Sequence, residues 1–127
     1  SELALRIVDL VNEERVRKGK AELEINDELM ESARVRAEEV SENFSHTRPD
    51  GTSCLTAINL EYAAASENAA HIYGYTMEDV AQNAVEAWIK SPGHHVAMIQ
   101  SKWEETGVGV YVNGTQVSVV QLFIKNK

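Results

Sequence analysis

The fold class is decided by the stretch GVGVYVNGTQVSVVQLFI, residues 107–124. Valine alternates with other residues up to Val112, Asn113-Gly114 is a typical two-residue hairpin turn, and apolar residues return from Val117 to Ile124. The second half is apolar at odd and even positions alike, which is typical of a strand that helices cover on both faces. The stretch therefore predicts a β-hairpin inside a layered fold.

The residues before the hairpin follow the 3.6-residue period of helices instead. The predicted helices run to about residue 17, from residue 26 or 27, from residue 76 to about 90 and from residue 91 to about 99, with a short helical piece within residues 54–62. The first three are predicted to bury Leu3, Ile7, Leu10 and Val11, then Leu29, Ala33, Ala37, Val40 and Phe44, then Val80, Ala84, Ala87 and Trp88. On the second helix, the solvated face is predicted to carry Arg34, Arg36, Glu38 and Glu39. Helices first and strands last predict an α+β layered sandwich.

Length and charge limit the classes of function. A chain of 127 residues has the size of one domain, so we expect a single domain over residues 1–127. Its formal net charge of −8 argues against binding to nucleic acid or to anionic membrane surfaces. No apolar run approaches the roughly 20 residues that span a bilayer. The chain opens without Met on an acidic amphipathic segment, so we expect that a leader has been removed.

The histidines are the first candidates for chemistry. His46 lies in a loop before the turn residues Pro49-Asp50-Gly51, and His94 lies in the first turn of the fourth predicted helix. Adjacent helical residues point about 100° apart, so His94 and His95 cannot share a pocket, and the helix dipole favours a neutral, ligating imidazole at His94. Spacing alone leaves two interpretations open, a shared His46/His94 site and two separate histidines bonded to solvent or backbone.

Glu67 and Cys54 are ambiguous in the same way. Glu67 lies in a run of small residues that suits a buried strand, where a carboxylate needs a partner, but a surface position is equally compatible. Cys54 is the only cysteine, which excludes an internal disulfide and favours a packed, inert thiol over a nucleophile. The chain has no His-Glu-x-x-His, no phosphate loop, no dinucleotide fingerprint and no Gly-x-Ser-x-Gly elbow.

Six motifs, taken in chain order, resemble the CAP superfamily (cysteine-rich secretory proteins, antigen 5 and pathogenesis-related 1), and its bacterial SCP-like extracellular branch in particular. They are Asn12-Glu13-Glu14-Arg15, Leu29 with Ala33, Ser45-His46-Thr47-Arg48-Pro49-Asp50-Gly51, Glu67-Asn68-Ala69-Ala70, Trp88 with Ser91-Pro92-Gly93-His94, and the strands Gly107-Val108-Gly109-Val110 and Val120-Gln121-Leu122-Phe123. The resemblance implies a three-layer α-β-α sandwich with a mostly antiparallel sheet and a central cleft.

The resemblance also implies roles for particular residues. His46 and His94 match the two cleft histidines and Glu67 matches the first cleft glutamate, while Ser91 takes the place of a second glutamate in the cleft and His95 the place of a usual arginine. In members that bind zinc or another divalent metal, the two histidines are ligands. His46 and His94 would then hold the ion, with Glu67 as a weak ligand, as the outer partner of a ligand, or as a base on bound water. The loss of the second glutamate predicts weak or absent metal binding.

Three interpretations of function follow. The favoured one is a secreted, non-enzymatic module, extracellular or at the cell surface, whose His/Glu cleft binds a small ligand, a metal ion or a protein partner. The alternative is a metal-assisted, protease-like hydrolase in which an ion on His46 and His94 activates water and Glu67 accepts its proton. In a purely structural third interpretation, Glu67 bridges the two histidines and holds the central loops together.

Overall fold

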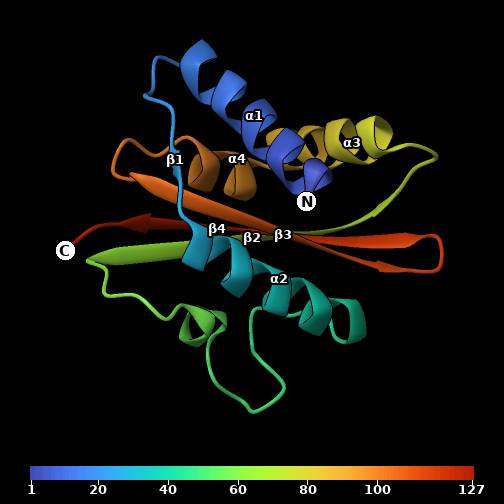
Figure 1. Ribbon diagram of the computed structural model, residues 1–127. Coiled ribbons are helices and arrows are strands. Elements are labelled where there is room, and N and C mark those ends of the chain that lie inside the picture. Colours follow the sequence, from blue (N-terminus) through green and yellow to red (C-terminus); the bar gives the residue numbers. More distant parts are fainter.

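A four-stranded sheet lies between two layers of helix in the computed structural model, which describes residues 1–127 (Figure 1). The strands lie in the order β1-β3-β4-β2, with β1 parallel to β3 and the other pairs antiparallel. Helices α1, α3 and α4 cover one face, and α2 with a short 3₁₀ helix covers the other. The bounds are α1 Glu2–Arg17, β1 Glu24–Ile25, α2 Asp27–Glu42, the 3₁₀ helix Cys54–Ala57, β2 Ala64–Tyr73, α3 Met77–Lys90, α4 Pro92–Met98, β3 Glu105–Asn113 and β4 Gln116–Lys125. The predicted α+β fold with a mostly antiparallel sheet between helices is confirmed.

The C-terminal hairpin forms as predicted, with a small change at its turn. Gly114 and Thr115 form the connection, one residue later than the predicted Asn113-Gly114. Gly114 has a φ of 63°, and glycine at the first turn position is typical of type II′ hairpins. β4 lies between β3 and β2 and is buried on both faces from Val117 to Ile124, as its continuous apolar sequence predicted.

Two apolar cores hold the layers together, one on each face of the sheet. The larger lies under α1, α3 and α4 and the smaller under α2. Two inward predictions are wrong. Phe44 is 56% exposed because α2 ends at Glu42, and its ring lies against that of His71. Ala87 is exposed because the buried stripe of α3 uses Val80, Ala81, Ala84, Val85 and Trp88.

Two glycines let α2 lie directly on β3. A Cβ atom at Gly107 would come within 2.2 Å of the Leu29 carbonyl carbon, and one at Gly109 within 2.2 Å of the backbone of Ala33. No side chain fits in that space, so the helix and strand approach more closely than other residues allow. This approach fixes the height of α2 above the sheet and with it the position of its polar residues.

The Asn12 and Arg15 motif of α1 has a structural role. Asn12 exchanges two hydrogen bonds with the backbone of Leu23. The guanidinium of Arg15, 1% exposed, donates to the carbonyl oxygens of Ala21, Met98 and Gln100. These bonds tie α1 to the segments that lead into β1 and out of α4, which places α4 beside the sheet.

Candidate functional site

A buried ion pair lies at the centre of the candidate site. β2 directs Glu67 toward α2, where Arg36 Nε donates to Glu67 Oε2 at 2.7 Å and Arg36 Nη2 to Oε1 at 3.0 Å. The two side chains are 0% and 1% exposed. Burial opposes the charge on Arg36, but the hydrogen bonds that Arg36 donates to Glu67 and Glu39 outweigh it and raise the pKa of Arg36 above its usual value. The prediction that Arg36 is solvated is therefore wrong, while the expectation that a buried Glu67 needs a partner is met.

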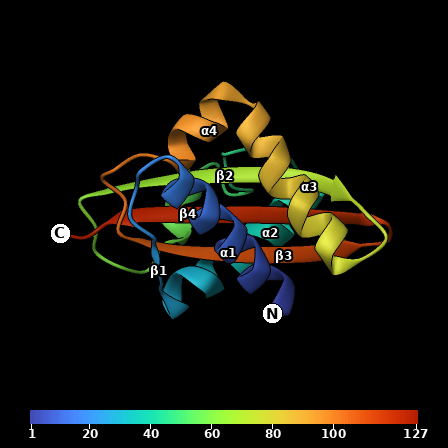
Figure 2. The ribbon, with the colours of Figure 1, turned by 90° about the horizontal axis from the view of Figure 1, so that it is seen from above.

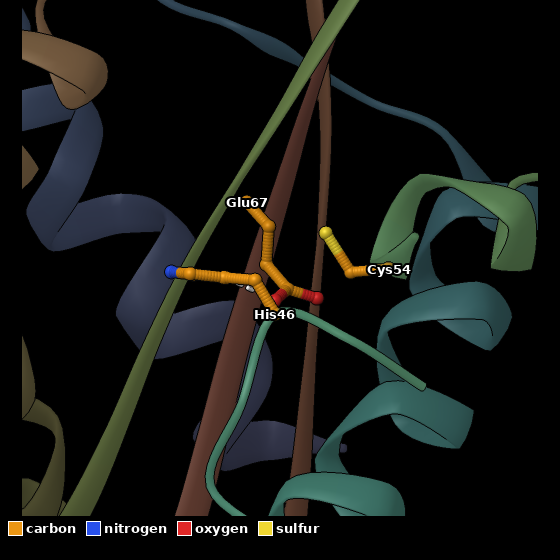
Figure 3. A group of neighbouring side chains, drawn as sticks. All are labelled: His46, Cys54 and Glu67. Atoms are coloured by element: carbon orange, nitrogen blue, oxygen red, sulfur yellow. Dashed lines mark hydrogen bonds and ion pairs between the residues drawn. The ribbon is translucent and has the colours of Figure 1, made fainter. Parts of the chain in front are cut away.

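His46 is held by the same carboxylate. Its Nδ1 lies 2.7 Å from Glu67 Oε1, while 62% of its side chain is exposed. An ionised carboxylate only accepts hydrogen bonds, so Nδ1 must carry the proton. In the neutral imidazole the lone pair then sits on Nε2. Figure 3 shows the second ring nitrogen of His46 directed away from Glu67 and Cys54.

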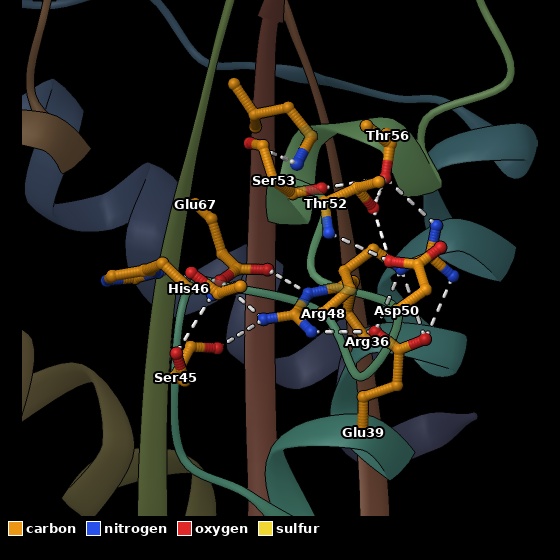
Figure 4. Close-up of polar contacts among 12 residues, drawn as sticks. Arg36, Glu39, Ser45, His46, Arg48, Asp50, Thr52, Ser53, Thr56 and Glu67 are labelled. Atoms are coloured by element: carbon orange, nitrogen blue, oxygen red, sulfur yellow. Dashed lines mark hydrogen bonds and ion pairs between the residues drawn. The ribbon is translucent and has the colours of Figure 1, made fainter.

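A polar network fixes the loop that carries His46 (Figure 4). Arg36 Nη2 donates to the carbonyl oxygen of Ser45 at 2.7 Å. Arg48 donates to the carboxylate of Glu39, which also accepts from Arg36. Arg48 further donates to Thr56 at 3.2 Å. These hydrogen bonds hold the loop, and with it the backbone of His46, in place.

His94 reaches the same region from α4. Its Nδ1 lies 2.7 Å from Ser91 Oγ, and its backbone carbonyl oxygen accepts from Asn68 Nδ2 of β2 at 3.1 Å. His46 and His94 both line one cavity of about 170 Å³, together with Phe44. Burial, followed by the nearby His46, lowers the pKa of His94 below its usual value, which favours the neutral imidazole.

The other two histidines lie outside this site. His95 Nε2 lies 2.7 Å from the buried carboxylate of Glu14, so this side chain points back to α1. His71 Nε2 lies 2.7 Å from the carbonyl oxygen of Val40, to which it donates. The separation of His94 from its neighbour thus agrees with the helical geometry expected from sequence. Glu67 contacts His46 but has no bond to His94, so the predicted bridge between the two histidines is only half formed.

Two sets of atoms offer metal-ligand chemistry. The first is His46, Cys54 and Glu67, with one potential ligand atom from each within 4.8 Å of the others (Figure 3). In this set the carboxylate is already neutralised by Arg36 and holds His46 through Nδ1. Burial, and then the Glu67 charge, raise the pKa of the Cys54 thiol, which keeps it protonated. The second set is the imidazoles of His46 and His94, two side chains that line one cavity.

Sequence reasoning missed Arg36 and Asn68 as parts of the site. Arg36 comes three residues after Ala33 and four before Val40, so helical spacing places it on the buried stripe. That spacing indicates a buried Arg36, whereas the prediction of a solvated side chain followed from its charge. Asn68 stood in the motif Glu67-Asn68-Ala69-Ala70, but its role did not follow from it, because its bond to the backbone of α4 depends on how two distant segments pack.

Comparison with known proteins agrees with this architecture. The family model of the cysteine-rich secretory protein (CAP) family matches residues 8–123. The membrane protein YlbC of Bacillus subtilis is 34% identical over 110 residues, which cover 83% of this chain and 30% of YlbC, so the chain spans under a third of that relative. None of the helices described above is both long and apolar enough to cross a membrane.

Two solved structures have the same fold. An outer surface protein of Borrelia burgdorferi has a TM-score of 0.79 and 26% identity, with 94% of this chain and 90% of that chain covered. The structure of NaASP2 with Zn²⁺ has a TM-score of 0.75 and 15% identity, with 100% and 82% covered, a likeness that concerns the fold alone. Because the family model covers nearly the whole sequence, the chain belongs to the cysteine-rich secretory protein (CAP) family.

Proposed function

We propose that this chain is a non-enzymatic binding module, extracellular or at the cell surface, whose cleft binds a divalent metal ion such as Zn²⁺ through His46 and His94. One observation carries the proposal: Glu67 accepts a hydrogen bond from Nδ1 of His46, which leaves Nε2 as the ring nitrogen able to bind an ion, and His46 lines one cavity together with His94. A carboxylate behind a histidine is the usual arrangement around histidines that ligate metals, because it fixes the tautomer and raises ligand basicity.

The donor set suits zinc but does not complete its coordination. Neutral imidazoles are typical zinc ligands, and the lowered pKa of His94 reduces competition from protons for that ring. Ser91 bonds His94 where a second acid would stand in the family pattern. Two protein ligands leave the other coordination positions of the ion to water or to an exogenous ligand. We therefore expect modest affinity for the metal ion, and we expect the ion to bind a ligand at its open positions.

The alternative of a metal-assisted hydrolase has weaker support. A catalytic base needs a carboxylate that can accept a proton, but both oxygens of Glu67 already bond to Arg36. Glu39, the other acid of the network, is occupied by Arg36 and Arg48. A proton on Glu67 would also leave the buried guanidinium of Arg36 without its main charge partner.

The location is proposed on the likeness to an outer surface protein. The Borrelia protein shares the fold over 94% of this chain at 26% identity. The membrane relative YlbC is matched over less than a third of its length. We infer that the chain acts as a surface or secreted module.

Calorimetric titration of metal-stripped protein with Zn²⁺ at pH 7 tests the function. We expect one site in the native protein and its loss in the double variant His46→Ala/His94→Ala. His95→Ala is the matched control, because it removes a neighbouring histidine whose ring already bonds to Glu14, and it should keep the site. No binding by native protein, or equal binding by the double variant, would refute the metal site. A Zn²⁺-dependent peptidase activity lost in His46→Ala would favour the hydrolase instead.

A further inference from the structure

The sheet has a free backbone edge on the side opposite the histidine cleft. β1 pairs with only Glu105 and Thr106 of β3, because Asn26 caps α2 and the chain leaves the sheet there. Beyond Thr106, β3 continues to Asn113 as the outermost strand. Figure 2 shows β3 and β2 at opposite edges of the sheet, with α4 beside β2. This edge is therefore separate from the proposed metal site.

The direction of the free backbone groups follows from the bonds that β1 makes. Glu24 and Asn26 donate to the carbonyl oxygens of Glu104 and Thr106, each at 3.0 Å. Backbone groups of alternate residues point to the same side of a strand, so those of Val108, Val110 and Val112 also point outward.

These outward groups have little or no partner in the protein. The N–H of Val108 reaches only Met30 Sδ, at 3.2 Å, and a thioether is a weak acceptor. No backbone or side-chain bond meets the outward groups of Val110 and Val112. Val112 is also 62% exposed. Unpaired strand edges of this kind are templates for pairing with another strand.

We propose that this edge binds an extended peptide segment of a partner protein by strand addition, along the line that β1 would follow if it continued. The partner's backbone would bond to Val110 and Val112 and would replace Met30 at Val108. A hollow of about 270 Å³ runs along this part of β3, and Val108 and Val110 line it with Met30. Strand addition supplies affinity through the main chain and specificity through alternate side chains.

A single strand fits this edge better than a second copy of the chain. α2 lies directly on β3, in contact with Gly107 and Gly109. Neighbouring strands are about 4.8 Å apart, so a second β3 paired here would bring its own α2 equally close to the first. Packed helices need about 8–10 Å between their axes. A partner strand without a helix on that face avoids the collision.

Charge near the edge favours basic side chains in the partner. Asp27 and Glu31 line the hollow together with Ser1 and Arg34, and Arg34 is already paired with Glu31 at 2.8 Å. The whole chain carries a net charge of −8. Lysine or arginine at alternate positions of the partner strand would face Asp27, which forms no ion pair within the chain.

Amide hydrogen exchange followed by NMR tests both the edge and its occupant. In the free protein, we expect Val110 and Val112 amides to exchange at least about a hundredfold faster than those of Gly109 and Tyr111, which face β4. The probe is an acetylated, amidated octapeptide of alternating Lys and Val. At millimolar concentration it should slow the exchange of Val110 and Val112. The same peptide N-methylated on alternate residues, which cannot pair as a strand, should not.

Variants of Val112 distinguish backbone pairing from nonspecific binding of the peptide to the protein surface. Val112→Pro removes the outward N–H of this residue, and the side chain that it replaces is exposed. It should weaken peptide binding about tenfold. Val112→Thr keeps the N–H and should bind as the native chain does. The proposal is overturned by unchanged exchange with the Lys/Val peptide, by equal binding of the N-methylated peptide, or by protection of the same amides through self-association without peptide.

Discussion

Replacing Glu67 by Gln should destabilise the protein by about 3 kcal/mol. The change keeps the shape of the side chain but removes the charge that neutralises Arg36, which is 0% exposed. Breaking a buried ion pair from one side costs about 3–5 kcal/mol, because a charge is left without compensation. Arg36 keeps Glu39 at 2.7 Å and the Ser45 carbonyl at 2.7 Å, so the lower end of that range applies. For a chain of this size the loss corresponds to a decrease in Tm of about 10 °C.

Urea unfolding followed by circular dichroism measures this loss. The matched control is Glu31→Gln on the same helix, because Glu31 and Arg34 form an ion pair in solvent, with side chains 62% and 52% exposed. It should cost under about 0.5 kcal/mol. In the double variant Arg36→Met/Glu67→Gln the unpaired cation is gone, so its stability should be no lower than that of Glu67→Gln alone. A loss below about 1 kcal/mol for Glu67→Gln, or strictly additive losses in the double variant, would refute the assignment of Arg36 as a buried cation.

Three further predictions concern packing and pH. Gly109→Ala should destabilise the protein by about 3 kcal/mol in urea unfolding, because its Cβ would enter the backbone of α2, whereas Gly93→Ala, with nothing within 4 Å, should be neutral or slightly stabilising; equal effects would contradict the close approach. In an NMR pH titration, His94 should titrate below pH 6.5, and at a higher pH in His46→Ala, because burial lowers its pKa and His46 adds to this; a value above 6.5 would show that the ring is solvated. Burial raises the pKa of Glu14, but the hydrogen bonds that Glu14 accepts outweigh burial and lower this pKa below 4.5. The ionised Glu14 therefore contributes its full stabilisation above about pH 4.5, and this stabilisation is lost as the pH falls through the pKa of the folded state. Urea midpoints between pH 7 and pH 3 should therefore fall less in Glu14→Gln than in the native chain, and parallel curves would contradict this role.

The order of helices and strands could be predicted because each element has its own local period. The alternation in residues 107–124 indicates a hairpin wherever the chain ends up, and the apolar residues on both faces of β4 require cover on both sides. The errors at Phe44 and Ala87 come from the limits of the same helical period. The period predicts the buried face of a helix to within about one residue, and it does not predict where the helix ends.

The candidate site could be predicted only as a set of residue types. His46, Glu67 and His94 were found through ordered motifs that resemble the CAP family, to which the chain belongs. Their partners could not be found in that way. The bond from Glu67 to His46 spans 21 residues and the ion pair with Arg36 spans 31, so both depend on how β2 and α2 lie across the sheet.

The sequence by itself thus determined the α+β class, the hairpin with its covered central strand, and the residues able to do chemistry. The tertiary structure alone decided which of those residues meet. It buried Arg36 against Glu67, turned His95 toward Glu14, and brought His46 and His94 to one cavity. It also left the edge of β3 unpaired beyond Thr106. The physical reason is that periodicity is encoded by neighbours in the chain, whereas the partners of a buried charge or an edge strand are set by packing between segments far apart in sequence.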